Sequence, residues 1–215
     1  MTVIASQEIQ ANICIQTGSL YGMPQIRLRP SYPNLKHDQN PEKGKQRSKC
    51  SKYYAQYGEQ RLTGGIMVAW CTHSIAYGFH CIPRAEGRND VFSALLTHWR
   101  TPPSWVIYDY ACALGPYCLT QEPHFFKNTR FVIDDCHSNG HTKCGPACFL
   151  KTYADKDPRL GLLNSSAAEC GNGGISRIRK PVSYMRQDRA IIYTRVFLAI
   201  WNRLKLRRLG KERRQ

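Results

Sequence analysis

The chain has 215 residues, with 31 Lys and Arg against 15 Asp and Glu, which gives a formal net charge of +16 at pH 7. Its 42% hydrophobic and 11% aromatic residues are typical of a folded chain and exclude disorder throughout. The surplus of positive charge predicts a polyanionic partner, most often nucleic acid, but indicates no preference for any base sequence.

The ten cysteines raise the alternative of a secreted, disulfide-bonded protein. The beginning of the chain, MTVIASQEIQANICIQTG, argues against it, because it contains Glu8, has no basic segment and scatters its apolar residues. No segment approaches the ~20 apolar residues of a membrane span, and the longest candidate, AIIYTRVFLAIW, contains Arg195. We therefore expect an intracellular protein without membrane association, in which cysteines near histidines are metal ligands or core residues.

Residues 1–60 differ in composition from the rest of the chain. The stretch RPSYPNLKHDQNPEKGKQRSKCSK is rich in Pro, Lys, Arg, Asn and Gln, which predicts a basic and mostly flexible N-terminal segment. From Thr63 the chain becomes β-branched and aromatic. The stretch GGIMVAWCTHSIAYGFHCI predicts two antiparallel strands with a turn near Thr72–Ser74.

Helices and short strands alternate in the middle of the chain. Asn89 or Asp90 can cap a helix whose apolar residues recur at helical spacing. The stretches WVIYD and RFVID predict buried strands that end at Asp109 and Asp134, and a helical region over residues 111–126 separates them. The apolar face of the first helix holds Phe92, Leu95, Leu96 and Trp99.

The last predicted element is a helix from about Asp188 to Leu209, followed by a basic C-terminal tail over residues 205–215. Its apolar stripe comprises Ile192, Val196, Ala199, Ile200 and Leu204. The order of elements predicts an α/β core over residues 61–204, with a mixed sheet and flanking helices. The basic residues expected to contact DNA phosphates are Arg203, Lys205, Arg207, Arg208, Lys211, Arg213 and Arg214. A second basic run, from Lys43 to Lys52, can serve the same purpose.

Three acidic residues are candidates for a metal-dependent site. Asp109 and Asp134 end two apolar stretches, and Glu169 lies in SSAAECGNGG, from which it can approach on a helix. Ligands of open α/β sheets bind beyond the carboxyl ends of strands, and converging carboxylates need a cation between them. The three acids therefore predict a site for Mg²⁺ or Mn²⁺. The alternative is that each aspartate only caps the helix that follows it.

The stretch CHSNGHTKCGPAC predicts a zinc site. His137, His141, Cys144 and Cys148 have gaps close to those of structural zinc sites, and Cys136 is a spare thiol. Cys112 and Cys118 follow the Asp109 strand and can contribute a ligand if that strand is adjacent. The alternative is a set of ordinary half-buried cysteines and histidines. We interpret the remaining histidines of the core as surface or packing residues: His73, His80, His98 and His124.

Four stretches in the same order resemble one protein family. They are GGIMVAWCTHSIAYGFHCIP, VIYDYACALGPYCLTQEPHFFKNTRFVIDDCHSNGHTKC, NSSAAECGNGG with RIRKPVSYM, and FLAIWNRL. Together they resemble the Kyakuja–Dileera–Zisupton transposases, especially their cysteine-cluster-associated fungal relatives. The resemblance covers residues 63 to about 204, roughly two thirds of the chain.

The resemblance implies a ribonuclease-H-like catalytic fold of DDE type that cuts and joins DNA with two divalent metals. The matching positions are Asp109 in YDxAC, Asp134 in D-x-x-H and Glu169 in E-x-x-N. The resemblance also places His137, His141 and Cys144 in a family motif, so that the acids carry the chemistry and the Cys/His cluster braces the sheet edge beside them. DNA as partner, nuclear localisation and homo-oligomerisation are expectations of this reading.

The chain departs from the family pattern near its start. A ribonuclease-H-like core opens with a catalytic aspartate on its first strand, yet Asp38 is the only aspartate upstream of Gly64 and lies in a Pro-rich stretch. We therefore expect a fragment or decayed copy of a transposase. The alternative, from a different class, is a non-catalytic, zinc-stabilised nucleic-acid-binding protein that uses the same basic residues.

Overall fold

The computed structural model describes residues 1–4, 65–82 and 87–212 as a mixed α/β fold around one five-stranded sheet. The strands are β1 (Thr2–Ile4), β2 (Gly65–Trp70), β3 (Ala76–Ile82), β4 (Trp105–Ile107) and β5 (Arg130–Val132). The longer helices are α2 (Arg88–His98), α3 (Ala111–Gln121), α8 (Ala167–Ser183) and α9 (Gln187–Glu212). The short helices are α4 (Pro123–Phe126), α5 (Asp135–Ser138), α6 (Leu150–Ala154), α7 (Pro158–Gly161) and the 3₁₀ turn η3 (Pro146–Cys148).

The sheet has the strand order β3-β2-β1-β4-β5 and contains both parallel and antiparallel pairs. β2 and β3 form the predicted antiparallel pair, and β4 and β5 run parallel to each other. β1 is antiparallel to β4 and parallel to β2. The prediction of a mixed sheet with flanking helices is confirmed. Because β4 and β5 are parallel, Asp109 and Asp134 follow strands that end at the same edge of the sheet.

The central strand is the main departure from the predicted organisation. We assigned residues 1–60 to a flexible segment, but Thr2–Ile4 lies between β2 and β4, and Val3 is fully buried. The backbone N–H of Trp70 donates to the carbonyl of Met1 at 2.9 Å. A run of three residues is too short to show the alternation by which strands are detected. The rest of the segment, with the basic run Lys43–Lys52 and Asp38, lies outside the described residues.

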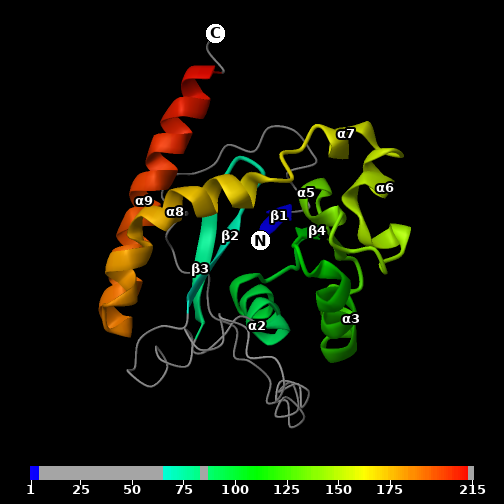
Figure 1. Cartoon of the computed structure of the whole chain (residues 1–215), viewed down its shortest axis with the longest axis horizontal. Helices are drawn as coiled ribbons and strands as arrows, with labels where there is room; N and C mark the ends of the chain where they lie inside the picture. Colours follow the sequence, from blue (N-terminus) through cyan, green and yellow to red (C-terminus); the bar gives the residue numbers. More distant parts are fainter. Residues whose placement is uncertain (5–64, 83–86, 213–215) are drawn as a thin grey trace.

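Helices pack on both faces of the sheet (Figure 1), and the side chains of the strands alternate between these two layers. On β2, Met67 and Ala69 join a core with α2, α3 and α4, whereas Val68 and Trp70 face α8 and α9. On the face of the sheet that carries α8 and α9, α6 and α7 cover β4 and β5. This alternation is the one that a sheet buried on both sides requires. No helix in the described part of the chain is long and apolar enough to cross a bilayer.

α8 forms despite three glycines in its first half. Gly171 packs on the ring of Trp70 and Gly174 on the ring of Trp201, and a Cβ at either position would clash with that ring. The glycines therefore let α8 approach both β2 and α9 closely, which offsets their poor helix propensity. The indole N–H of Trp70 also donates to Asn172 Oδ1 at 3.2 Å. These contacts position the N-terminal turn of α8, which carries Glu169.

α9 confirms the predicted last helix and continues to Glu212, so residues 205–212 are helical. The predicted apolar stripe, however, is wrong as the buried face. Ile192, Val196, Ile200 and Leu204 are all exposed, whereas Thr194, Leu198 and Asn202 are buried. Asn202 bonds the backbone of Ala76 through both its amide oxygen and its amide nitrogen, at 2.9 Å each. A hydrogen-bonded polar side chain thus faces the sheet where hydrophobicity alone predicted an apolar one.

The start of α2 also differs from the prediction. The helix begins after Gly87, so Asn89 and Asp90 lie in its first turn, and Asp90 accepts the backbone N–H of Gly87 at 3.0 Å. The predicted apolar residues Phe92, Leu95 and Leu96 are buried as expected.

Candidate active site and metal centre

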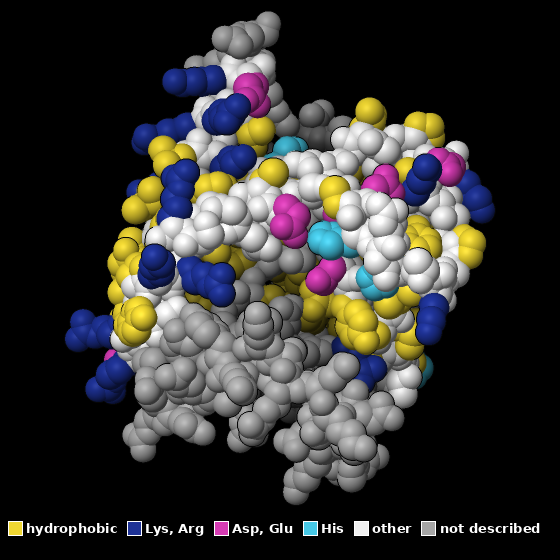
Figure 2. Space-filling model, viewed as in Figure 1, with side chains coloured by type: hydrophobic (Ala, Val, Ile, Leu, Met, Phe, Trp, Pro, Cys, Tyr) yellow, Lys and Arg dark blue, Asp and Glu magenta, His cyan; other side chains and the backbone are white. Residues whose placement is uncertain are grey.

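Three acids from separate elements line one cavity of about 270 Å³. Asp109 follows β4, Asp134 follows β5, and Glu169 lies in the first turn of α8. The cavity is also lined by Thr2 of β1 and by His137. Figure 2 shows acidic and histidine side chains gathered around one hollow of this face, with Lys and Arg over α8 and α9 beside it. Asp109 and Asp134 thus follow neighbouring parallel strands at one edge of the sheet, and Glu169 lines the same cavity from α8.

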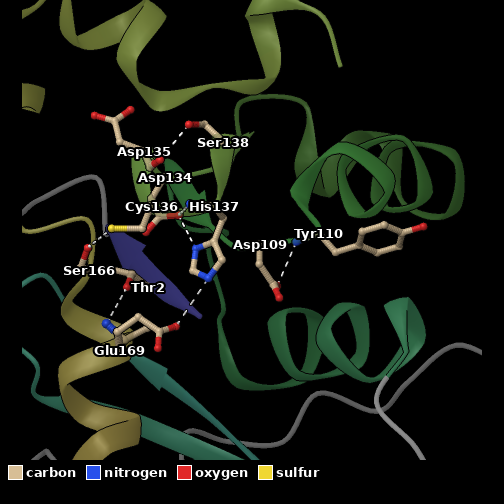
Figure 3. Close-up of polar contacts among 11 residues, drawn as sticks. Thr2, Asp109, Tyr110, Asp134, Asp135, Cys136, His137, Ser138, Ser166 and Glu169 are labelled. Atoms are coloured by element: carbon tan, nitrogen blue, oxygen red, sulfur yellow. Dashed lines mark hydrogen bonds and ion pairs between the residues drawn. The ribbon is translucent and has the colours of Figure 1, made fainter. Parts of the chain in front are cut away.

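His137 joins two of the acids (Figure 3). Its Nδ1 lies 2.6 Å from Asp134 Oδ1, and its Nε2 lies 4.0 Å from Glu169 Oε1. The hydrogen bond to Asp134 raises the pKa of His137 above its usual range, and the negative charges of Asp134, Asp109 and Glu169 act in the same direction against partial burial. The imidazole therefore senses all three carboxylates, which places His137 in the acidic cavity.

Asp134 has two roles in this arrangement. Its side chain is almost completely buried, and its Oδ1 accepts the backbone N–H of His137 at 3.3 Å as the N-cap of α5. The simple capping interpretation of Asp134 is thus correct but incomplete, because the same carboxylate lines the cavity. Asp109 is exposed, and its Oδ1 accepts the N–H of the following residue, Tyr110, at 2.9 Å.

The acids share a cavity but are not gathered around one point. Among the described residues, the single group of three ligands whose donor atoms all lie within 4.8 Å of one another is Cys112, His141 and Cys144. Asp109, Asp134 and Glu169 do not form such a group. His137 stands between Asp134 and Glu169, so a cation that bridged these two carboxylates would have to displace the imidazole ring.

The Cys112–His141–Cys144 group is the strongest metal-binding geometry in the described part of the chain. The Nδ1 atom of His141 lies 3.5 Å from the sulfur of Cys112 and 3.5 Å from that of Cys144. Cys112 lies in the first turn of α3, while the other two follow α5, so the group ties two separate segments together. Thiolate and imidazole donors at this spacing can bind a metal ion.

Cys148 is a neighbour of Cys144 but lies outside the group of three. Burial raises the pKa of Cys148, and a nearby Cys144 thiol raises it further by hydrogen bonding and charge. The pKa of Cys112 is raised in the same way, first by burial and then by Cys144 and Cys148. Burial and the neighbouring thiols thus both favour the protonated form of Cys112 and Cys148.

The structure corrects the predicted ligand set. We predicted His137, His141, Cys144 and Cys148, but the group that the structure brings together is Cys112, His141 and Cys144. His137 lines the acidic cavity instead, and Cys148 lies outside the group. Sequence spacing favoured His137 because it precedes His141 by four residues. α5 ends at Ser138, and the turn that follows separates the two histidines.

The other cysteines of the described part take no part in this group. Cys118 is fully buried in the core with α2, where burial raises its pKa, and it lies outside the Cys112–His141–Cys144 group. Cys136 is exposed, and its sulfur lies 3.4 Å from Ser166 Oγ. No disulfide occurs among the described residues. His73 and His124 are exposed, and His80 stacks edge-on against His98, as we interpreted them.

The basic residues predicted to contact DNA lie on the C-terminal third of α9. Arg203, Arg207, Arg208 and Lys211 are exposed, and Lys205 Nζ lies 5.6 Å from the centroid of the Trp201 ring. Arg208 Nε also bonds Glu212 Oε1 at 3.0 Å. Arg213 and Arg214 lie outside the described residues.

Comparison with protein-family models, with curated proteins and with solved structures finds no match for this chain.

Proposed function

We propose that the chain is a DDE-type transposase core with a ribonuclease-H-like fold, of the Kyakuja–Dileera–Zisupton family, that binds and cleaves DNA. The observation that carries this proposal is the meeting of Asp109, Asp134 and Glu169, from three separate elements, at one cavity. The mixed sheet and its two helical layers support the fold assignment. Nuclear localisation follows from a DNA substrate, and homo-oligomerisation remains a prediction of the family resemblance.

The cavity residues fit Mg²⁺ or Mn²⁺ in donor chemistry, since carboxylate oxygens are the ligands these ions take. Bound there, such ions would activate a water or a 3′-hydroxyl and stabilise the charge that develops on the attacked phosphodiester. Asp134 contributes the buried carboxylate, while Glu169 approaches from the opposite wall on α8. His137 holds Asp134 in place through its Nδ1.

The Cys112–His141–Cys144 group, with Cys148, is proposed to bind zinc as a structural ion. Three thiolates and one imidazole form a donor set typical of closed zinc sites. Cys112 follows Asp109 by three residues, and His141 follows His137 by four. Zinc would therefore fix the two loops that present the acids to the cavity.

The test is Mn²⁺-dependent nicking of supercoiled DNA by zinc-loaded protein. We expect Asp109→Asn and Glu169→Gln each to reduce nicking by a factor on the order of 10² or more, because each removes a metal-binding charge. The matched controls are Asp155→Asn and Glu212→Gln, which neutralise exposed acids away from the cavity. Nicking by both cavity variants at the parental rate would refute the catalytic assignment.

A second candidate function is a non-catalytic, zinc-stabilised nucleic-acid-binding protein. Two observations favour it. The first strand of the sheet presents Thr2 to the cavity where a DDE core carries its first carboxylate, and Thr2 Oγ1 accepts the N–H of Ala168 at 3.1 Å. The three acids, moreover, do not surround a common point. A parent protein that binds DNA but never nicks it, with fully loaded zinc, would establish this function instead.

A further inference from the structure

The outer face of α8 changes charge along its length. Glu169 stands at the cavity in the first turn, and the last turns carry the exposed residues Arg177, Arg179 and Lys180. Within the described part of the chain, none of these three cations makes an ion pair. Three unpaired cations on one helix leave a local excess of positive charge directly beside an acidic cavity.

Two of the cations share a face with the cavity wall. Ala168, Asn172 and Ile175 line the cavity, and Arg179 follows them at the three- and four-residue spacing of one helix face. Lys180 continues the neighbouring row, which runs from Glu169 through Gly173 and Ser176. Arg177 follows Gly173 by four residues and precedes Lys180 by three, so it flanks this row on the side away from the cavity wall.

The surface of α8 between Glu169 and the cations carries only small side chains. Gly173 and Ser176 are exposed, and a Cβ at Gly173 would meet nothing within 4 Å. Glu169 and Lys180 lie roughly 16 Å apart along the helix, at about 1.5 Å per residue. A DNA strand carries a phosphate about every 3.4 Å along the duplex axis, so this surface spans several phosphates.

We propose that α8 is a DNA rail, in which Arg179 and Lys180 bind backbone phosphates and direct the strand across Gly173 and Ser176 into the acidic cavity. The inference rests on the proposed function and adds a position for the substrate. It assigns DNA contact to α8, whereas the sequence suggested the C-terminal third of α9. The fit is one of charge and shape: cations at one end, small side chains in the middle and the acids at the other end.

The test is binding of the full-length, zinc-loaded chain to a DNA duplex over a range of salt concentrations without added Mg²⁺ or Mn²⁺. We expect Arg179→Gln/Lys180→Gln to weaken binding about tenfold or more and to reduce the salt slope by about 2, at about 0.9 per phosphate contact. Ser176→Glu should weaken binding as well, because it places a negative charge on the rail. Gln and Glu are good helix formers, so α8 should remain folded.

The matched controls are Lys151→Gln/Lys156→Gln, which removes the same charge from exposed positions in α6 and in the turn after it, and Thr120→Glu on α3. Equal loss of affinity in the rail and control variants would overturn the rail and indicate nonspecific attraction. Tighter binding to an RNA duplex than to DNA would overturn the DNA assignment. Because binding is measured without cleavage, a chain that never nicks DNA still supports the rail if only the rail variants lose affinity.

Discussion

Asp134 shows how one residue can serve both stability and a site. It is buried to 4% exposure and accepts two hydrogen bonds from His137, one from the backbone and one from the ring. Its neighbour Asp135 is exposed. The two adjacent aspartates therefore have the same chemistry in very different environments.

We expect Asp134→Ala to lower the free energy of unfolding by about 1–3 kcal/mol, because the helix α5 loses its N-cap and His137 loses its partner. Asp135→Ala should change it by less than about 0.5 kcal/mol, as is usual for surface positions. Urea unfolding of both variants measures the difference. Equal effects would mean that the Asp134–His137 pair contributes nothing to folding.

The residues of the site were predictable where a single stretch of chain determines them. Asp109 and Asp134 follow apolar strands, and two such strands in parallel place their ends together. Cys112 could only be suggested, since its contact with His141 depends on how α3 packs beside β5, which no local pattern encodes. His137 was misassigned because spacing along the chain does not show which way a side chain of the short helix α5 points.

At the scale of elements, two neighbouring glycines of α8 allow the effect of close packing to be measured apart from the effect of helix propensity. Gly174 lies against the Trp201 ring, whereas Gly173, its neighbour in the same helix, has open space where a Cβ would be. The two positions therefore offer opposite responses to the same substitution.

We expect Gly174→Ala to destabilise the protein by about 1–3 kcal/mol, because the added methyl group forces Trp201 or α9 to move. Gly173→Ala should stabilise it by about 0.5–1 kcal/mol through better helix propensity. Thermal or urea unfolding tests both. If the two variants have the same sign, α8 does not approach α9 as closely as the structure places it.

Helices and strands long enough to show a periodic pattern of apolar residues could be predicted from the sequence. A very short strand and a buried polar contact could not. The β2–β3 pair and the span of α9 follow from their composition. β1 has only three residues and pairs with strands far away in the sequence, so its place in the sheet is a tertiary result. The buried face of α9 was mispredicted because Asn202 satisfies its amide on Ala76, which no hydrophobic pattern reveals.

At the scale of the whole molecule, the Cys/His group joins parts of the chain that the sheet alone does not hold. Cys112 lies in the first turn of α3, and His141, Cys144 and Cys148 lie in the segment between α5 and α6. That segment contains little buried apolar surface of its own, since its residues from Asn139 to Ala147 are mostly exposed. A metal bound here would therefore stabilise a region with few other contacts.

We expect the purified chain to bind one zinc ion and to lose stability when a chelator removes it. Zinc at about 1,000 times its Kd would add about 4 kcal/mol to the free energy of unfolding, because the unfolded chain lacks the assembled site. Cys112→Ser and Cys144→Ser should abolish both the bound zinc and this stabilisation. Cys170→Ser, at an exposed cysteine on α8, should leave both unchanged. Metal content and urea unfolding with and without zinc measure the effect.

His137→Gln supplies the decisive contrast, because it should retain zinc if His137 belongs to the acidic cavity. Loss of zinc in that variant would return His137 to the ligand set.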